Sequence, residues 1–114
     1  NDCGTFSDKS VDYPDFGHKV AKSVLEGSVD YGIVVCGSGI GISIAANRNK
    51  GIRAALCTSI DHARLSRLHN DANVLALGSM LTDEKNIYNI IDVFFSTNFE
   101  GGRHSDRIKK IEYI

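Results

Sequence analysis

The sequence predicts an α/β fold in which helices cover both faces of a mainly parallel sheet. Short apolar runs alternate with helical patterns along the whole chain, which indicates right-handed βαβ units. The 114 residues suffice for one domain with a buried core. In such sheets, ligands bind beyond the carboxyl ends of the strands. We therefore expect functional residues where the strands end.

The first half of the chain predicts two helices around one strand. Pro14 fits the first turn of a helix, where Asp15 is favoured by the helix dipole, and Gly27 ends that helix. Residues 31–36 predict a short buried strand. Residues 39–47 then begin a second helix, rich in small residues.

The middle of the chain repeats this alternation. Residues 53–57 predict a second strand, and Ser59 is a good cap for a helix that runs to about Leu68. Residues 73–77 predict a third strand, which Gly78 closes.

The C-terminal part predicts two more helices. Thr82 is expected to cap the most strongly amphipathic helix. The apolar residues that define its buried face are Ile87, Ile90, Ile91, Phe94 and Phe95. Two glycines at 101 and 102 interrupt the chain, and residues 103–113 predict a final helix.

Composition excludes several function classes. A formal charge of −1 argues against nucleic acid or an anionic membrane as partner, and no run of about 18 apolar residues occurs. The three cysteines, without C-x-x-C spacing, favour neither a disulfide scaffold nor a zinc site, and they fit a reducing cytoplasm. We expect Cys57 to fill the core.

The four histidines show no metal-ligand spacing, so no metal site is predicted. The chain starts like the tail of a strand, so we expect a first strand to be missing.

The turn after the first strand is the most informative motif. Gly37, Gly39 and Gly41 form a G-x-G-x-G pattern, which is neither a P-loop nor a dinucleotide fingerprint. It is either a tight βα turn that needs glycine for its conformation or a ring of amides that faces a ligand oxygen. Cys36 is correspondingly either a core thiol or a base or nucleophile that helix-terminal amides stabilise as thiolate.

Two later segments carry further candidates. His69 and Asn70 are either capping and turn residues or donors to substrate oxygens, with His69 also able to act as acid or base. Arg103 and Arg107 share one helical face, where they can grip a phosphate. The alternative is an exposed basic face paired with Asp106 or Glu112.

Several strings occur together in one order, and in combination they resemble the ribose-5-phosphate isomerase B family, which includes galactose-6-phosphate isomerase subunits. The strings are residues 36–47, 51–55, 65–73 and 100–104, followed by Arg107. The resemblance implies a cofactor-free aldose–ketose isomerase on a Rossmann-like three-layer sandwich, with an open-chain sugar phosphate as substrate.

The resemblance also implies a reaction. Ribose 5-phosphate and ribulose 5-phosphate would interconvert through a cis-enediolate, in the non-oxidative branch of the pentose phosphate pathway. The alternatives are a hexose-6-phosphate isomerase of the same family and a non-catalytic phosphate- or nucleotide-binding module.

The resemblance implies roles for residues at the glycine turn. Cys36 matches the base, and Ile42 occupies the position of a glutamate base in another branch of the family. Ser38 and the backbone amides that follow match the group that stabilises the enediolate oxygen. These amides belong to Gly37, Gly39, Ile40 and Gly41. Tyr13 matches a loop residue near the sugar.

The remaining roles concern ring opening and phosphate binding. His69 matches the histidine that opens the sugar ring, and Asn70 matches a ligand of a substrate oxygen. Arg103 and Arg107 match phosphate-binding arginines that come from the partner in a homodimer, whose pairing into tetramers stays open. Met80 departs from the family, in which many members have an arginine there.

Overall fold

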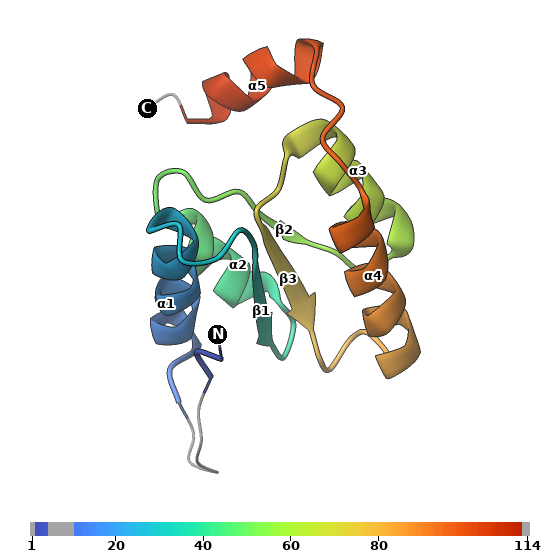
Figure 1. The fold of residues 1–114 in the computed structure, drawn as a ribbon. Coiled ribbons are helices and arrows are strands. Elements are labelled where there is room, and N and C mark those ends of the chain that lie inside the picture. The colour runs from blue at the N-terminus through green and yellow to red at the C-terminus, as the bar shows by residue number, and fades with distance from the viewer. Residues whose placement is uncertain (1, 5–10, 113–114) are drawn as a thin grey trace.

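A three-stranded parallel sheet lies between two helical layers (Figure 1). The computed structural model describes residues 2–4 and 11–112. Helices α1 and α2 pack together on one face, and α3 and α4 pack together on the other. In chain order the elements are α1 (Tyr13–Leu25), β1 (Gly32–Cys36), α2 (Ile40–Asn47), β2 (Ala54–Leu56), α3 (Ile60–Asn70), β3 (Val74–Gly78), α4 (Glu84–Ser96) and α5 (Arg103–Ile111). The predicted three-layer parallel architecture is confirmed.

Strand β3 is the centre of the sheet, with β1 on one side and β2 on the other. Gly32 pairs with Val74 at the start of β1, and Cys36 pairs with Gly78 at its end. All three strands run the same way, so they share two edges. We call the edge where Cys36, Leu56 and Gly78 end the strands the carboxyl edge, and the opposite edge the amino edge.

The sheet separates two apolar cores, as the alternation of side chains along β3 requires. Val74 and Ala76 belong to the core beneath α1 and α2. Leu75 and Leu77 belong to the core beneath α3 and α4, where Phe94 is 1% exposed. All five residues of β3 are buried. This central strand therefore fixes the positions of both helical layers relative to the two edges.

Strand β1 is less buried than the sequence predicted. Ile33 and Val35 are 38% and 49% exposed, because among the described residues β1 pairs only with β3 and lies at one side of the sheet. Their face borders an apolar cavity of about 520 Å³ that Phe16 and Phe95 also line.

Most element boundaries lie within one or two residues of the predictions, and the residue that caps α4 differs. Helix α4 is capped by Asp83 and not by Thr82, since the Asp83 carboxylate accepts a hydrogen bond from the Asn86 amide at 2.9 Å. Thr82 instead belongs to the preceding turn, where its amide donates to the carbonyl of Gly78 at 3.1 Å. Helix α5 ends at Ile111, and position 113 lies outside the described residues. None of the helices in the described part of the chain is long and apolar enough to span a membrane.

A candidate active site divided between the two edges of the sheet

Cys36 is the last residue of β1 and lies directly before the first turn of α2. The Gly39 amide donates a hydrogen bond to Cys36 Sγ across 3.2 Å. This hydrogen bond fixes the sulfur beside the first turn of α2. Cysteine acts as base or nucleophile in its thiolate form. Cys36 is partly exposed, which leaves the sulfur open to a ligand.

Gly39 is required by both conformation and space. Its φ of +78° lies in the left-handed region. A Cβ at this position would stand 2.5 Å from Leu56 Cδ1 and 2.8 Å from the carbonyl carbon of Leu77. The tight-turn reading of the motif is therefore correct, and the same tight turn aims the amide at the thiol.

The turn after β3 holds the cysteine loop in place through backbone hydrogen bonds. The Ser79 amide donates to the Cys36 carbonyl at 3.0 Å, and the Met80 amide donates to the Gly37 carbonyl at 2.9 Å. The Met80 side chain covers Gly37 and is 83% exposed. Two loops from neighbouring strands thus form one surface at the carboxyl edge.

Helix α1 contributes Tyr13 to this surface. A Cβ added to Gly41 would overlap the Tyr13 hydroxyl, so the phenol ring lies directly against the glycine turn. Tyr13 is 44% exposed and can reach a ligand there. The structure therefore brings Tyr13 and Cys36 to the same edge, from segments more than twenty residues apart.

Ser38 offers a hydroxyl beside the thiol. The Ile40 amide donates to Ser38 Oγ at 3.1 Å, which leaves the Ser38 hydroxyl hydrogen to donate outward. The amides of Gly41 and Ile42 belong to the first turn of α2 and have no acceptor within the helix. Together these donors can stabilise an oxyanion that develops near Cys36.

Cys57 confirms the prediction of a core thiol. It is 1% exposed in the core beneath α3 and α4. Burial raises the pKa of the Cys57 thiol to about 11, although a hydrogen bond with Ser66 acts in the opposite direction. Cys57 is therefore a protonated, inert thiol at neutral pH.

His69 and Asn70 lie at the amino edge, at the end of α3 just before β3 begins. The His69 ring stacks on the ring of His104 from α5, with centroids 4.3 Å apart and planes 19° apart. Arg103 and Arg107 are exposed on the same helix. Within residues 2–4 and 11–112 neither arginine forms an ion pair, so both are available for an anion.

His104 and Glu100 are members of this cluster to which the sequence assigned no role. His104 is 5% exposed, and its Nε2 lies 4.0 Å from Glu100 Oε1. Burial lowers the pKa of His104, with a further lowering from His69, while Glu100 raises it and the two arginines lower it. Histidines 35 positions apart show no spacing signal, and only the packing of α5 on α3 brings them together.

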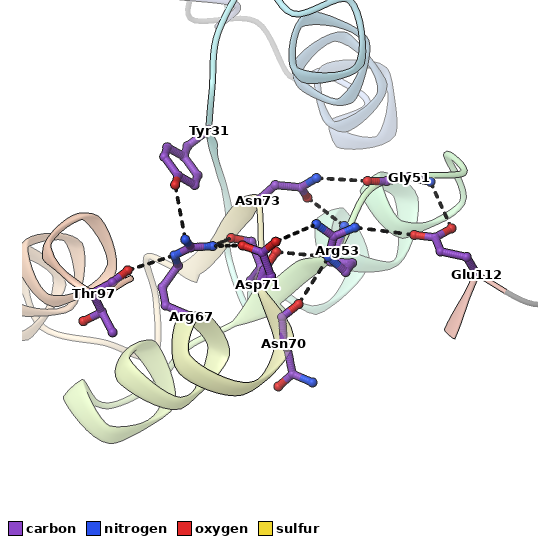
Figure 2. Close-up of polar contacts among 10 residues, drawn as sticks. Tyr31, Gly51, Arg53, Arg67, Asn70, Asp71, Asn73, Thr97 and Glu112 are labelled. Carbon is purple, nitrogen blue, oxygen red and sulfur yellow. Dashed lines mark hydrogen bonds and ion pairs between the residues drawn. The ribbon is translucent and has the colours of Figure 1, made fainter. Parts of the chain in front are cut away.

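An arginine network holds the turn that carries His69 and Asn70 (Figure 2). Arg53 Nε donates to the carbonyls of Asn70 and Asp71 at 3.2 and 3.0 Å. Arg67, which is 4% exposed, donates to Asp71 Oδ1 at 2.9 Å. Asp71 has a left-handed φ of +45°, and these contacts hold it there. The network positions the end of α3 without using either of the two candidate side chains.

Glu112 joins the same network and does not pair with Arg103 or Arg107. Its Oε1 lies 3.6 Å from Arg53 Nη1, and its Oε2 accepts a hydrogen bond from the Gly51 amide at 3.2 Å. Figure 2 shows Arg53 between Asp71 and Glu112. The alternative in which Glu112 neutralises the basic face of α5 is therefore wrong.

The two clusters lie at opposite edges of the sheet. Figure 1 shows α5 beyond the start of β3, and the tips of the β1 and β3 arrows at the other end. The four steps from Gly32 to Cys36 span about 13 Å at roughly 3.3 Å per residue. A single chain therefore presents Tyr13, Cys36 and Ser38 at one edge, and His69, Asn70 and the two arginines at the other.

A family model described as Ribose/Galactose Isomerase matches residues 1–111. The chain belongs to this family of sugar isomerases. The family match confirms the resemblance found in the four sequence strings.

Relatives of the Ribose/Galactose Isomerase family align over nearly the whole chain. A putative sugar phosphate isomerase of Rickettsia bellii is 51% identical over 111 residues, which are 97% of this chain and 77% of the relative. Ribose-5-phosphate isomerase B of Escherichia coli is 47% identical over 113 residues, or 99% of this chain and 76% of the relative.

Solved structures in the family agree with the fold. The ribose 5-phosphate isomerase of Thermotoga maritima has a TM-score of 0.95 and 53% identity, with 97% of this chain and 77% of that chain covered. Ribose-5-phosphate isomerase B of Clostridium thermocellum has a TM-score of 0.94 and 54% identity, with coverage of 96% and 74%. The three-layer arrangement with a parallel sheet is thus shared with experimentally determined isomerases.

Proposed function

We propose that this chain interconverts ribose 5-phosphate and ribulose 5-phosphate, with Cys36 as the base. The observation that carries the proposal is the Gly39 amide, which donates to Cys36 Sγ at 3.2 Å. The names of the relatives support the substrate. The reaction would belong to the non-oxidative branch of the pentose phosphate pathway, in the cytoplasm.

The proposed step is a proton transfer beside a carbonyl. The Cys36 thiolate removes the proton from C2 of the open-chain aldose, and the electron pair moves onto the C1 oxygen to give a cis-enediolate. The C2 hydroxyl proton passes to the C1 oxygen, which moves the negative charge to the C2 oxygen. The same thiol then returns its proton to C1 as the C2 carbonyl forms, which yields the ketose and restores the thiolate. Ser38 and the first-turn amides of α2 stabilise the negative oxygen, because hydrogen-bond donors act most strongly where charge develops.

The proposed site needs two protomers. Arg103 and Arg107 suit a phosphate, which they can bind with charge-assisted hydrogen bonds. His69 would open the sugar ring, and Asn70 would bind a substrate oxygen. These four lie at the amino edge, about 13 Å from Cys36 by the strand length. We therefore propose a homodimer in which the carboxyl edge of one protomer faces the amino edge of the other.

Loss of the proposed base tests the reaction. Cys36→Ala is expected to lower kcat for ribose 5-phosphate by about 10²–10⁴-fold, the usual contribution of a positioned acid or base. Cys3→Ala is the matched control, because Cys3 is also a partly exposed free thiol. Near-normal turnover in a folded Cys36→Ala variant would show that the base is assigned wrongly.

Complementation tests the shared site separately. Cys36→Ala and Arg107→Ala should each be poorly active, and mixed dimers should contain one site without either change. Random re-association should then restore roughly a quarter of wild-type activity, since half of the dimers carry one intact site of two. No recovery, with mixed dimers demonstrated by mass, would place all of the residues in one protomer.

A hexose 6-phosphate is the alternative substrate, because the family description names both ribose and galactose. The fold and the proton transfer would be unchanged. Competition between ribose 5-phosphate and galactose or allose 6-phosphate for the same enzyme distinguishes the two, with the preferred sugar showing the higher kcat/KM. Binding of nucleotides without any exchange of the C2 proton would instead support a non-catalytic module.

A further inference from the structure

Three side chains at the amino edge converge on one point. They come from the end of α3, from the segment before α5 and from α5 itself: His69, Glu100 and His104. The nitrogen and oxygen atoms that they offer all lie within 4.8 Å of one another. In the part of the chain that the structure describes, none of these three side chains forms a hydrogen bond, so their lone pairs remain available.

The donor set is one that transition metals prefer. Two imidazoles and one carboxylate bind Zn²⁺ in catalytic zinc sites, with bonds of about 2.0–2.2 Å and a fourth position left for water or another ligand. Two ligands of a tetrahedral ion with such bonds are roughly 3.3 Å apart. The three atoms therefore need to approach by at most about 1.5 Å.

The backbone around the cluster allows this approach without unfolding. The Glu100 amide donates to the Leu68 carbonyl at 3.1 Å, which ties the segment before α5 to the last turn of α3. His104 is 5% exposed and is held between these segments. His69 is only half-buried and the Glu100 side chain is 58% exposed, so both can move toward the ring of His104.

We propose that His69, Glu100 and His104 form a site for a divalent transition-metal ion of the Zn²⁺ class within a single protomer. Arg103 and Arg107 lie close enough to act on the charge of His104, and they oppose a cation. The site is therefore weaker than a structural zinc site, and the ion binds reversibly.

Metal binding would compete with catalysis, and this consequence rests on the proposed function. A lone pair of His69 that binds an ion cannot accept a proton from the sugar. Zn²⁺ is therefore expected to inhibit isomerisation, and removal of the ion with EDTA is expected to restore it. Inhibition measured for each variant relative to its own metal-free rate separates this effect from changes in basal activity.

Direct titration tests the site without any substrate. Zn²⁺ alone is titrated into the metal-free protein by calorimetry, and Co²⁺ replaces it for absorption spectroscopy. Wild-type protein should bind one ion per protomer, and Glu100→Gln and His104→Gln should each weaken binding at least about tenfold, since loss of even a ligand-orienting residue costs roughly 10–100-fold. Glu100 is exposed, so its variant remains informative if His104→Gln fails to fold.

The matched control is His62→Gln on the same helix. His62 is exposed, its ring bonds Thr58 at 3.0 Å, and it lies two helical turns before His69. Its substitution should leave the affinity unchanged. Equal affinity in wild type, Glu100→Gln and His104→Gln would overturn the proposal, as would thiolate charge-transfer bands in the Co²⁺ spectrum. Failure of the isomerase assay would leave the titration result intact.

Discussion

The carboxyl edge is built by the backbone, whereas the amino edge is built by side chains. At the carboxyl edge, the amides of Gly39, Ser79 and Met80 fix the loop around Cys36. At the amino edge, Arg53 and Arg67 fix the turn around His69 through their guanidinium groups. The first edge should therefore be sensitive to changes in backbone conformation, and the second to loss of a single side chain.

Alanine substitutions at two glycines with the same backbone conformation allow a direct comparison of the two edges. Gly39 and Gly101 have φ values of +78° and +77°, but only Gly39 is closely surrounded. Gly39→Ala should cost about 2–5 kcal/mol in the free energy of unfolding, from left-handed strain and overpacking together. Gly101→Ala should cost about 1–2 kcal/mol from strain alone. Urea denaturation measures both, and equal costs would contradict the packing argument.

Arg67 provides the corresponding test at the amino edge. Arg67→Ala leaves the carbonyls of Ala72 and Thr97 and the Asp71 carboxylate without their donor. We expect a loss of about 2–4 kcal/mol, below the full cost of a broken buried pair because Asp71 is partly exposed. Arg64→Ala on the same helix removes an exposed pair with Asp61 at 3.0 Å. It should cost less than about 1 kcal/mol.

Cys57 makes the core behind the carboxyl edge sensitive to alkali. Its folded-state pKa of about 11 exceeds the ordinary value of 9.0, so the unfolded chain loses this proton first. Stability should fall as pH rises from about 9 to 11, by roughly 2–3 kcal/mol in total. Denaturation curves across this range measure the slope. Cys57→Ala should reduce the slope, and Cys3→Ala should leave it unchanged.

Arg107 tests function at the amino edge with little effect on stability. Arg107→Ala should lower kcat/KM by about 10–100-fold, the loss expected for a charge-assisted hydrogen bond of roughly 1.5–3 kcal/mol. The unfolding free energy should stay within about 0.5 kcal/mol of wild type, because the side chain is exposed. Lys109→Ala, another exposed cation on α5, is the control. Equal losses of kcat/KM in both variants would indicate a general effect of positive charge on α5 and not a specific contact of Arg107 with phosphate.

The same contrast explains what the sequence could predict. Cys36 and its glycines are contiguous, so a strand, a turn and a helix N-terminus were predictable from local pattern, and the structure places them as expected. The stack of His69 on His104 depends on how α5 packs on α3, for which no local signal exists. Asp83 and Thr82 are both good caps by residue type. In the structure Thr82 belongs to the turn after β3, and the Asp83 carboxylate accepts the capping hydrogen bond from the Asn86 amide.

The partial exposure of β1 also could not be predicted from the local sequence pattern. Residues 31–36 have the composition of a buried strand, but burial depends on which elements pack beside the strand. Tyr13 was assigned to the site by family resemblance alone, and its contact with Gly41 gives a physical reason for that assignment. The placement of the candidate residues at two opposite edges of the sheet follows only from the parallel register.

At position 80 the backbone has a structural role, whereas the side chain is free to vary. The main-chain N–H of Met80 donates to the Gly37 carbonyl and so holds the cysteine loop, while its side chain lies over Gly37 and is exposed to solvent. Any residue except proline can make the same hydrogen bond, since only proline lacks the donor. Substitution at position 80 can therefore replace the thioether with a cationic or amide side chain while the backbone hydrogen bond to Gly37 is kept.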